Sequence, residues 1–543
     1  MCPYHKTKYF SPFSNDRRKL CTFVLLQILT TPLYAILIHV PADYPEIQDA
    51  INAASNGDVI AVAPGTYQPI DFFNKHLEIY ATDPDPSNTI ITGGGIAEHV
   101  VTVVGGQTLS NSLTRFTITG GHATGNGGGV YVNGSRLLLK ECKIVNNHAD
   151  GNGGGIYIID EVTSVIDCFI GSNNADGDGG GIAMSNAFGN HIASNEFSNN
   201  VSNNNDPSAF GGGAIFMENA QAYIKKCHFN NNTGHAGGAI TTYLVSESEI
   251  SGCTFNNNHS LTYGGAIYCI SGSHPDILRC WFEGNSAVLN GGALSCDTGC
   301  SPYVESCGFF NNSANSGAAV DVYNYGGPYL YCCTIAYNNA LIQAGAIIND
   351  SNADTWTTNC IIYGNTPVGS DFVNINSATH LIKSSIFDNP FAPGWDPQIG
   401  QDGGNNIVNI DPLFENGATG NFNLKLGSNA IDSGDSSILI PPPPPEGYFD
   451  GNNRERIVDH QSTSNSGPFN PGDIGPVDMG CFEFNPCSGN TDNFSIVNLS
   501  DLANIADRFG DTDCGTCGGA DLNGDNNVGT PDLLIVAEDW TCN

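Results

Sequence analysis

The chain has 543 residues and a mass of 57.2 kDa, which exceeds one ordinary domain and predicts two or three. Gly contributes 66 residues without a G-X-Y period, which excludes collagen, and a hydrophobic content of 40% excludes wholesale disorder. With 18 basic against 54 acidic residues, the formal charge is −36, so we expect no nucleic-acid binding and regard divalent cations as natural partners.

The N-terminus has the pattern of a secretory signal. Basic residues at 17–19 precede an apolar run over 20–34 that is followed by Ala35. The pattern predicts a signal peptide over residues 1–35, an exported bacterial protein that is extracellular or on the cell surface, and no transmembrane domain after cleavage. An uncleaved anchor is the alternative, because apolar residues resume at Ile36.

Residues 36–94 are expected to form an N-terminal cap. Apolar residues at i, i+3, i+4 and i+7 predict a short amphipathic helix through Ile47, Ala50, Ile51 and Ala54. A strand over 59–63 and a turn over 64–67 are expected to follow it. This stretch resembles the N-terminal cap of secreted β-helix proteins, including pectinesterase-like and pectate-lyase-like ones. The resemblance implies a cover for the first coil and carries no catalytic residue across.

An internal repeat occupies residues 95–370. Gly-rich tetrads, mostly 25 to 27 residues apart, begin at Gly127, Gly153, Gly179, Gly212, Gly237, Gly264 and Gly291. A second register, dominated by cysteine, consists of Cys142, Cys168, Asn195, Cys227, Cys253, Cys280, Cys307, Cys333 and Cys360. Five residues after each of these comes Asn147, Asn173, Asn200, Asn232, Asn258, Asn285, Asn312, Asn338 and Asn365.

These registers predict an all-β right-handed parallel β-helix. Apolar side chains two residues apart share one face of a strand, and stacked coils bury that face and pair the backbone. The repeated Asn is expected in left-handed conformation, with its amide bonded to the next Asn. The cysteine ladder is interpreted as buried small side chains instead of disulfides or metal ligands. Off the ladder, Cys269 and Cys296 are one coil apart, and a disulfide between them is the alternative to free thiols.

The paired motifs point to a family resemblance. GGAI tetrads alternate with FxxN segments such as Phe197–Asn200 and Phe229–Asn232. The combination resembles the polymorphic outer-membrane-protein repeats of surface-exposed bacterial β-helix proteins, many of them adhesins. Residues 371–486, where the repeat dissolves, resemble the C-terminal region of bacterial secreted β-helix proteins and are expected to form the end of the β-helix and to cap it.

A calcium module is expected over residues 487–543. Oxygen ligands for Ca²⁺ at positions 1, 3, 5, 7 and 12 of a loop are provided by Asp521, Asn523, Asp525, the carbonyl of Asn527, and Asp532. The choice of Asp at position 12 resembles dockerin type I repeats. This resemblance implies a cohesin-like scaffold protein as partner and tethering to a scaffold or cell surface.

An upstream copy of this loop is degraded. Aligned on Asp501, its first ligands are Asn490 and Asp492, but Phe494 stands where a third oxygen is needed, so this site is expected to be weak or lost. Cysteines bracket the two copies and are interpreted as disulfides in preference to zinc ligands, namely Cys487, Cys514, Cys517 and Cys542.

The candidate catalytic residues lie before the first Gly triplets. Stacking at a spacing of 26 residues should place His122 on His148, Asp150 on Asp176 and Asn152 on Asp178, which is compatible with a Ca²⁺ site or an acid/base pair. Turns whose side chains bond their own backbone are the favoured alternative.

Two functions remain open. The first is a surface protein whose long face recognises an extracellular polysaccharide or surface glycan. The second is a polysaccharide lyase or glycoside hydrolase that uses a groove along the β-helix to act on a pectin-like or other acidic glycan. The regular repeat favours the first, because catalytic coils usually interrupt the pattern with long loops, whereas the tail and the cap resemblance favour the second.

Overall fold

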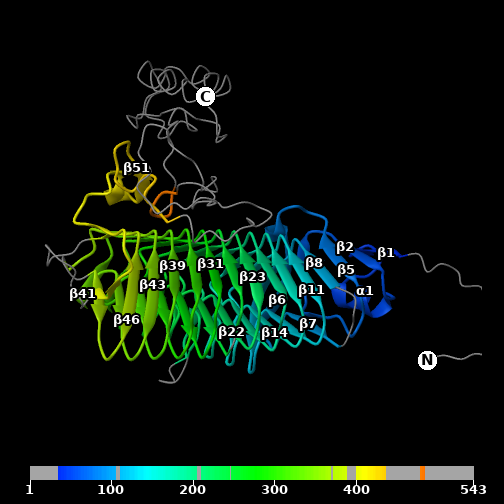
Figure 1. Ribbon diagram of the computed structural model, residues 1–543. Helices are drawn as coiled ribbons and strands as arrows, with labels where there is room; N and C mark the ends of the chain where they lie inside the picture. The colour runs from blue at the N-terminus through cyan, green and yellow to red at the C-terminus, as the bar shows by residue number, and fades with distance from the viewer. Residues whose placement is uncertain are drawn as a thin grey trace, which may run out of the picture. The chain divides into compact units, whose positions relative to one another are not determined.

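The structure is a computed structural model that describes residues 35–105, 111–204, 210–244, 246–367, 371–387, 399–435 and 477–482. The chain divides into two compact units, Met1–Ala35 and Ile36–Asn543, and all described helices and strands belong to the second. Within that unit the chain winds as a parallel β-helix in which neighbouring strands come from successive coils (Figure 1).

Sheet A has fifteen parallel strands, which follow one another along the stack. Its strands are β1 (Leu37–Val40), β2 (Val59–Val62), β5 (Glu78–Ala81), β8 (Asn111–Thr114), β11 (Leu137–Lys140), β15 (Thr163–Ile166), β19 (Asn190–Ala193), β23 (Ala222–Lys225), β27 (Glu249–Ser251), β31 (Asp276–Leu278), β35 (Tyr303–Glu305), β39 (Tyr329–Tyr331), β43 (Asp354–Thr358), β46 (Thr379–Lys383) and β48 (Gln401–Asp402).

Sheet B follows sheet A in each coil. Its strands are β3 (Gly65–Tyr67), β6 (Thr89–Ala97), β9 (Thr117–Ala123), β12 (Lys143–Val145), β16 (Phe169–Gly171), β20 (Glu196–Ser198), β24 (His228–Asn230), β28 (Thr254–Asn256), β32 (Trp281–Glu283), β36 (Gly308–Phe310), β40 (Thr334–Ala336), β44 (Ile361–Tyr363), β47 (Ile386–Phe387) and β49 (Ile407–Val408).

A ladder of very short strands, sheet D, comes next, and sheet C completes the coil. Sheet D contains β13 (His148–Ala149), β17 (Asn174–Ala175), β21 (Val201–Ser202), β25 (Thr233–Gly234), β29 (His259–Ser260), β33 (Ser286–Ala287), β37 (Ser313–Ser316) and β41 (Asn339–Gln343). Sheet C contains β4 (Ile70–Asp71), β7 (Val101–Val104), β10 (Val130–Asn133), β14 (Ile156–Ile159), β18 (Ile182–Ser185), β22 (Ile215–Glu218), β26 (Ile240–Tyr243), β30 (Ile267–Ile270), β34 (Leu294–Cys296), β38 (Val320–Val322), β42 (Ile347–Asn349) and β45 (Phe372–Asn374).

The expected register of like residue over like residue is confirmed. Ile250 pairs with Ile277, which in turn pairs with Val304, and all three are fully buried. Inside sheet B the ladder of phenylalanines from Phe197 to Phe309 stacks at centroid distances of 4.7 to 4.8 Å. This spacing matches the distance between hydrogen-bonded strands, so each coil buries its apolar face against the next.

The asparagine ladder forms as predicted, but its backbone conformation differs from the prediction. Asn258 Nδ2 donates to Asn285 Oδ1 at 2.9 Å and to the carbonyl of Phe229 at 2.9 Å, and the ladder residues are buried. The left-handed residue is the one before the ladder position, such as Asn257 with φ +54°. The left-handed corner turns the chain, and the next side chain then points inward to bond the adjacent coil.

The cysteine ladder is buried, as predicted. Its thiols also bond the backbone, since Cys142 Sγ donates to the carbonyl of Lys140 at 3.3 Å and Cys168 Sγ accepts from the amide of Cys142 at 3.4 Å. Cys269 and Cys296 pair in register in sheet C and are free thiols, which decides against the alternative of a disulfide there.

The Gly tetrads allow close approach of adjacent coils. Gly153 has φ +69°, and a Cβ on Gly154 would lie only 2.2 Å from the carbonyl oxygen of Asn174. A side chain at either position would therefore strain the corner between sheets D and C.

At the start of the stack, helix α1 (Ile47–Ala53) forms where the apolar spacing predicts it and buries Ile47, Ala50 and Ile51. The helix contacts β1, β2 and β4. The turn expected over 64–67 is instead strand β3, which pairs with β6, because the next coil supplies backbone partners for an extended chain. A short 3-10 helix, η1 (Pro86–Asn88), precedes β6.

The coils continue past residue 370, where the sequence repeat is no longer visible, because β45 to β49 extend sheets A, B and C to Val408. The chain then forms an antiparallel pair, β50 (Phe414–Asn416) and β51 (Asn421–Leu424), linked by η3 (Gly417–Thr419). Phe422 packs on Phe310 and Trp281 of sheet B. The described part of 371–486 therefore extends the stack and covers a side of sheet B. Among the described residues, no helix is long and apolar enough to cross a bilayer.

Candidate functional site

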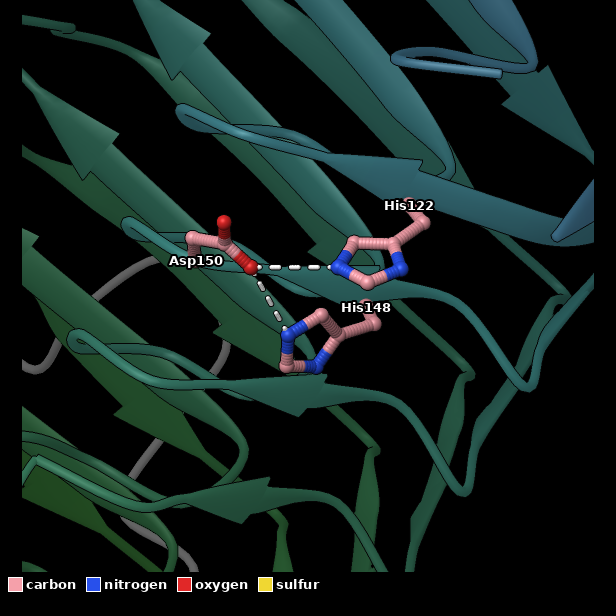
Figure 2. A group of neighbouring side chains, drawn as sticks. All are labelled: His122, His148 and Asp150. Carbon is pink, nitrogen blue, oxygen red and sulfur yellow. Dashed lines mark hydrogen bonds and ion pairs between the residues drawn. The ribbon is translucent and has the colours of Figure 1, made fainter. Parts of the chain in front are cut away.

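Four of the five candidate catalytic residues converge, as their spacing predicts. His122 of β9 pairs with His148 of β13, and Nε2 of each ring lies 3.1 Å from Oδ1 of Asp150 (Figure 2). Asp176 lies 3.7 Å from Nε2 of His148. Hydrogen bonds, first from His122 and then from His148, lower the pKa of Asp150.

Asp178 does not join this cluster. Its Oδ1 accepts a hydrogen bond from Asn204 Nδ2 at 2.9 Å, and burial raises its pKa. The favoured alternative, side chains that bond their own backbone, also differs from the structure. Asn152 Oδ1 accepts from the amide of Asp178, one coil further on, at 2.8 Å. These turns are therefore held by contacts between coils.

In the cluster of His122, His148 and Asp150, the first and last side chains are exposed, His148 is half-buried, and both rings bond to Asp150. The three ligand atoms of the cluster lie within 4.8 Å of one another, which is compatible with a transition metal, but imidazoles are poor ligands for the expected Ca²⁺. Exposed side chains often lie this close without an ion, and the hydrogen bonds to Asp150 account for the arrangement. We therefore assign neither a metal nor a catalytic role to this cluster.

The expected calcium ligands lie outside the described residues, as do the cysteines that bracket them. The ligands are Asp492, Asp501, Asp521, Asn523, Asp525, Asn527 and Asp532.

A different set of polar and aromatic side chains lies on the outer face of sheet A. Seven successive strands, β19 to β43, each direct one residue outward from the same position, while the flanking residues enter the core. We call this set the aromatic–acid row: His191, Tyr223, Glu249, Asp276, Tyr303, Tyr329 and Trp356.

Within the aromatic–acid row, a pair of carboxylates lies between aromatic side chains. Glu249 and Asp276 are directly paired on adjacent strands. On one side His191 stacks on Tyr223 at 5.2 Å, and on the other Tyr329 stacks on Trp356 at 4.7 Å with an interplanar angle of 10°. All seven side chains are exposed or half-buried, so the row is open to a ligand.

A pocket of about 360 Å³ opens at the acidic part of this row. We call it the acidic pocket, and it is lined by Gln221, Tyr223, Glu247, Ser248, Glu249, His274 and Asp276. Its carboxylates come from one strand residue on each of β27 and β31 and from Glu247, which precedes β27.

The two paired carboxylates have different surroundings. Glu249 forms an ion pair with Lys225 at 2.9 Å and accepts a hydrogen bond from Ser251 at 3.0 Å. Burial, and then the charges on Glu249 and Glu247, raise the pKa of Asp276. An acidic residue with a raised pKa beside an ion-paired carboxylate is an arrangement that serves proton transfer in many sites.

A buried carboxyl lies on sheet C. Asp321 of β38 is 3% exposed, and its Oδ2 accepts a hydrogen bond from Ser295 Oγ at 2.7 Å. Burial raises its pKa to about 7, and Asp297 adds to the effect. The side chain is enclosed by its neighbours, so it bears on stability more directly than on ligand binding.

Sequence reasoning missed the aromatic–acid row because it followed the inward registers. The signal is present four residues before each rung of the cysteine register from Asn195 to Cys360, where His191, Tyr223, Glu249, Asp276, Tyr303, Tyr329 and Trp356 occur. Reading this outward position through every coil finds the row without a structure.

Comparison with known proteins agrees with the expected fold. A family model described as a right handed beta helix region matches residues 109–309, in agreement with the predicted right-handed winding. No curated protein matches the chain.

Several solved structures are similar at low identity. A PL6 family polysaccharide lyase from Pseudopedobacter saltans is 11% identical over 72% of this chain and 96% of its own, with a TM-score of 0.33. A pectate lyase is 13% identical over 83% and 96%, with a TM-score of 0.30. Pectin methylesterase from carrot is 12% identical over 47% and 84%, with a TM-score of 0.26. Similarity at this level says nothing about the chemistry of the present chain.

Proposed function

We propose that this protein binds a polysaccharide along the outer face of sheet A. The observation that carries the proposal is the aromatic–acid row, in which a carboxylate pair is flanked on both sides by stacked aromatic rings. Aromatic side chains offer large apolar surfaces to the faces of sugar rings, and carboxylates accept hydrogen bonds from sugar hydroxyls.

The geometry favours an extended, repetitive ligand. The row advances by one strand spacing, about 4.8 Å, per coil, so it presents similar contacts at regular intervals along the stack. A polymer of sugars lying parallel to the stack meets several of these contacts at once. The charge of −36 opposes a nucleic acid as the repetitive ligand.

Affinity electrophoresis of the full chain tests this proposal with a neutral glucan, xylan, chitosan and polygalacturonate. We expect at least one polysaccharide to retard the protein and Tyr303→Ala to weaken that binding about tenfold. Tyr131→Ala is the matched control, because Tyr131 stacks on Tyr157 on sheet C, away from the row. Equal losses for both variants, or no retardation by any polymer, would contradict the proposal.

A second candidate function is hydrolysis of the bound glycan by Glu249 and Asp276. The adjacent strands that carry them lie about 4.8 Å apart, so the two side chains can reach the separation of roughly 5 to 5.5 Å that retaining glycosidases place between their carboxyl groups. In this scheme protonated Asp276 gives its proton to the glycosidic oxygen while the Glu249 carboxylate attacks the anomeric carbon and the C–O bond breaks. Water then cleaves the glycosyl ester and returns the proton to Asp276.

Release of reducing ends at saturating glycan tests this second function. If the protein hydrolyses the glycan, Glu249→Gln should abolish turnover. Glu78→Gln, which changes an exposed acid on β5 of the same sheet, should leave turnover intact. Binding without turnover on the glycan that retards the protein would reject hydrolysis and leave the binding function in place.

We also propose export and calcium-dependent tethering through the C-terminal module. The support is the signal-like N-terminus and the spacing of Asp521, Asn523, Asp525 and Asp532. Calorimetric titration of the full chain with Ca²⁺ should show a site that Asp525→Ala removes and that Asp492→Ala, in the degraded copy, leaves. Unchanged Ca²⁺ binding in Asp525→Ala would contradict the assignment of this loop.

A further inference from the structure

The acidic pocket carries more negative charge than its own cations neutralise. Three carboxylates line it, from Glu247, Glu249 and Asp276, while the lining that the structure describes contains no Lys or Arg. Outside the lining, Lys225 forms an ion pair with Glu249, and its Nζ lies 5.8 Å from the ring centroid of Tyr223. Burial raises the pKa of Asp276, and the charges on Glu249 and Glu247 add to this shift, as expected of carboxylates that lie close together.

Carboxylates alone would not indicate a ligand, but here they surround a cavity inside the aromatic–acid row. Tyr223 belongs both to the row and to the lining of the pocket, so a sugar stacked on the row places its substituents at the pocket. Tyr303 continues the row on the other side of Asp276. The pocket therefore occupies one sugar position of a longer binding face.

Resting on the proposed function, we infer that the acidic pocket binds the protonated amine of an amino sugar, so that the preferred glycan is cationic. An ammonium group offers three donors to the carboxylates of Glu247, Glu249 and Asp276. Hydrogen bonds between charged groups are roughly twice as strong as neutral ones. The neighbouring aromatic faces of Tyr223 and Tyr303 also favour a cation.

The same charges disfavour the other glycan classes. A uronic acid would bring a fourth carboxylate to a site whose carboxylates already repel one another. A neutral sugar would leave the excess charge unpaired while displacing the water that solvates it. We therefore expect this protein to prefer a cationic glycan to an anionic, pectin-like one.

The test measures binding of the full chain to three short oligosaccharides by calorimetry. Chitosan hexamer carries amines, chitin hexamer has the same backbone with every amine acetylated, and a hexameric galacturonide is anionic. We expect chitosan hexamer to bind at least about tenfold more tightly than chitin hexamer, and the galacturonide to bind most weakly. Asp276→Asn and Glu247→Gln should each reduce chitosan binding about tenfold, to near the level of chitin hexamer.

A matched control separates the pocket from the general attraction between an acidic protein and a polycation. Glu78→Gln removes one outward charge from the same sheet at β5, far along the stack from β31, and should change chitosan binding less than twofold. Equal losses for Glu78→Gln and Asp276→Asn would overturn the inference. Equal affinity for chitosan and chitin hexamers, or preference for the galacturonide, would overturn the inference and leave glycan binding intact. If none of the three hexamers bound and no polysaccharide of the panel retarded the protein, the proposed function would be contradicted as well.

Discussion

The inner asparagine ladder and the outer aromatic–acid row run through the same coils in the same register. From Asn147 to Asn365 every rung of the ladder is asparagine, and each amide bonds the next. On the outer row the residue changes from aromatic to acidic and back to aromatic over seven strands. Both positions stack at one strand spacing, so stacking alone does not explain the difference.

The difference shows which side chains the fold requires and which positions it leaves free to vary. An inward polar side chain must find partners in the adjacent coils, and an identical neighbour provides them in every coil. An outward side chain has water as its partner, so the fold leaves its identity open. A patterned departure from uniformity on the outside therefore points to a ligand.

The largest expected effect comes from breaking the inner ladder at Asn258. Its amide takes part in four hydrogen bonds, with Asn232 N, Asn232 Nδ2, the carbonyl of Phe229 and Asn285 Oδ1. Asn258→Ala removes all four of these buried hydrogen bonds, at about 1 kcal/mol each, although Asn285 Oδ1 still accepts from the backbone amide of residue 258, so we expect a loss on the order of 4 kcal/mol. Thermal unfolding followed by circular dichroism measures it.

The matched control for this change lies on the same coil. Leu261 is 45% exposed, and Leu261→Ala should lower the unfolding midpoint only slightly. If Asn258→Ala were no more destabilised than Leu261→Ala, the ladder would not be what holds this corner of the coil.

A smaller effect is expected from the buried carboxyl of sheet C. The folded pKa of Asp321 is raised to about 7, above the unfolded value of about 3.9, so the folded state binds the extra proton between these values. The stability that this proton uptake contributes is present at low pH and is lost as pH rises through 7. The free energy of unfolding should therefore fall by about 3 kcal/mol between pH 5 and pH 8. Asp321→Asn should flatten this dependence and raise the unfolding midpoint at pH 8 relative to wild type.

The pH experiment has an internal check. Asp402→Asn changes an exposed acid on β48 and should leave the pH dependence of the unfolding midpoint as in wild type. A wild-type midpoint that rises between pH 5 and pH 8, and rises equally in Asp321→Asn, would contradict the protonated state assigned to Asp321.

The smallest expected effect on stability, but a clear one on binding, comes from the outer row. Trp356→Ala removes a half-buried ring that stacks only at the surface on Tyr329, so the unfolding midpoint should fall by a few degrees at most. Binding of the glycan that retards the wild-type chain should weaken about fivefold to tenfold, measured by affinity electrophoresis. If Trp356→Ala lowered the unfolding midpoint and kept full affinity for the glycan, the row would contribute to stability and not to binding.

The inner face could be predicted from the sequence, and the outer face could not. Repetition at Cys253, Asn258 and their equivalents predicts the register because the core imposes the same demand on every coil. The left-handed position was predicted one residue late, since pairs such as Asn257-Asn258 contain two residues suited to it and only the backbone shows which one turns. The sequence repeat fades after residue 370 although the coils continue, because β46 and β47 pair through backbone groups and need no repeated side chain.

The candidate site shows the same division. Stacking of His122 on His148 followed from a spacing of 26 residues, and the structure confirms it. The relation between Glu249 and Asp276 also follows from spacing, but only once the outward register is known. Core packing does not dictate which residues occupy that outward register. The row is therefore recognised only when the exposed positions of successive coils are aligned.

The most direct test of the account is a hydroxyl-radical footprint of the full chain with and without the glycan selected by affinity electrophoresis. Binding along sheet A predicts protection of Tyr223, Tyr303, Tyr329 and Trp356, with unchanged reactivity at Tyr131 on sheet C and at Phe73, which is 56% exposed near the start of the stack. Protection at Tyr131 or Phe73 with the row left reactive would contradict the claim that the outer face of sheet A is the binding surface.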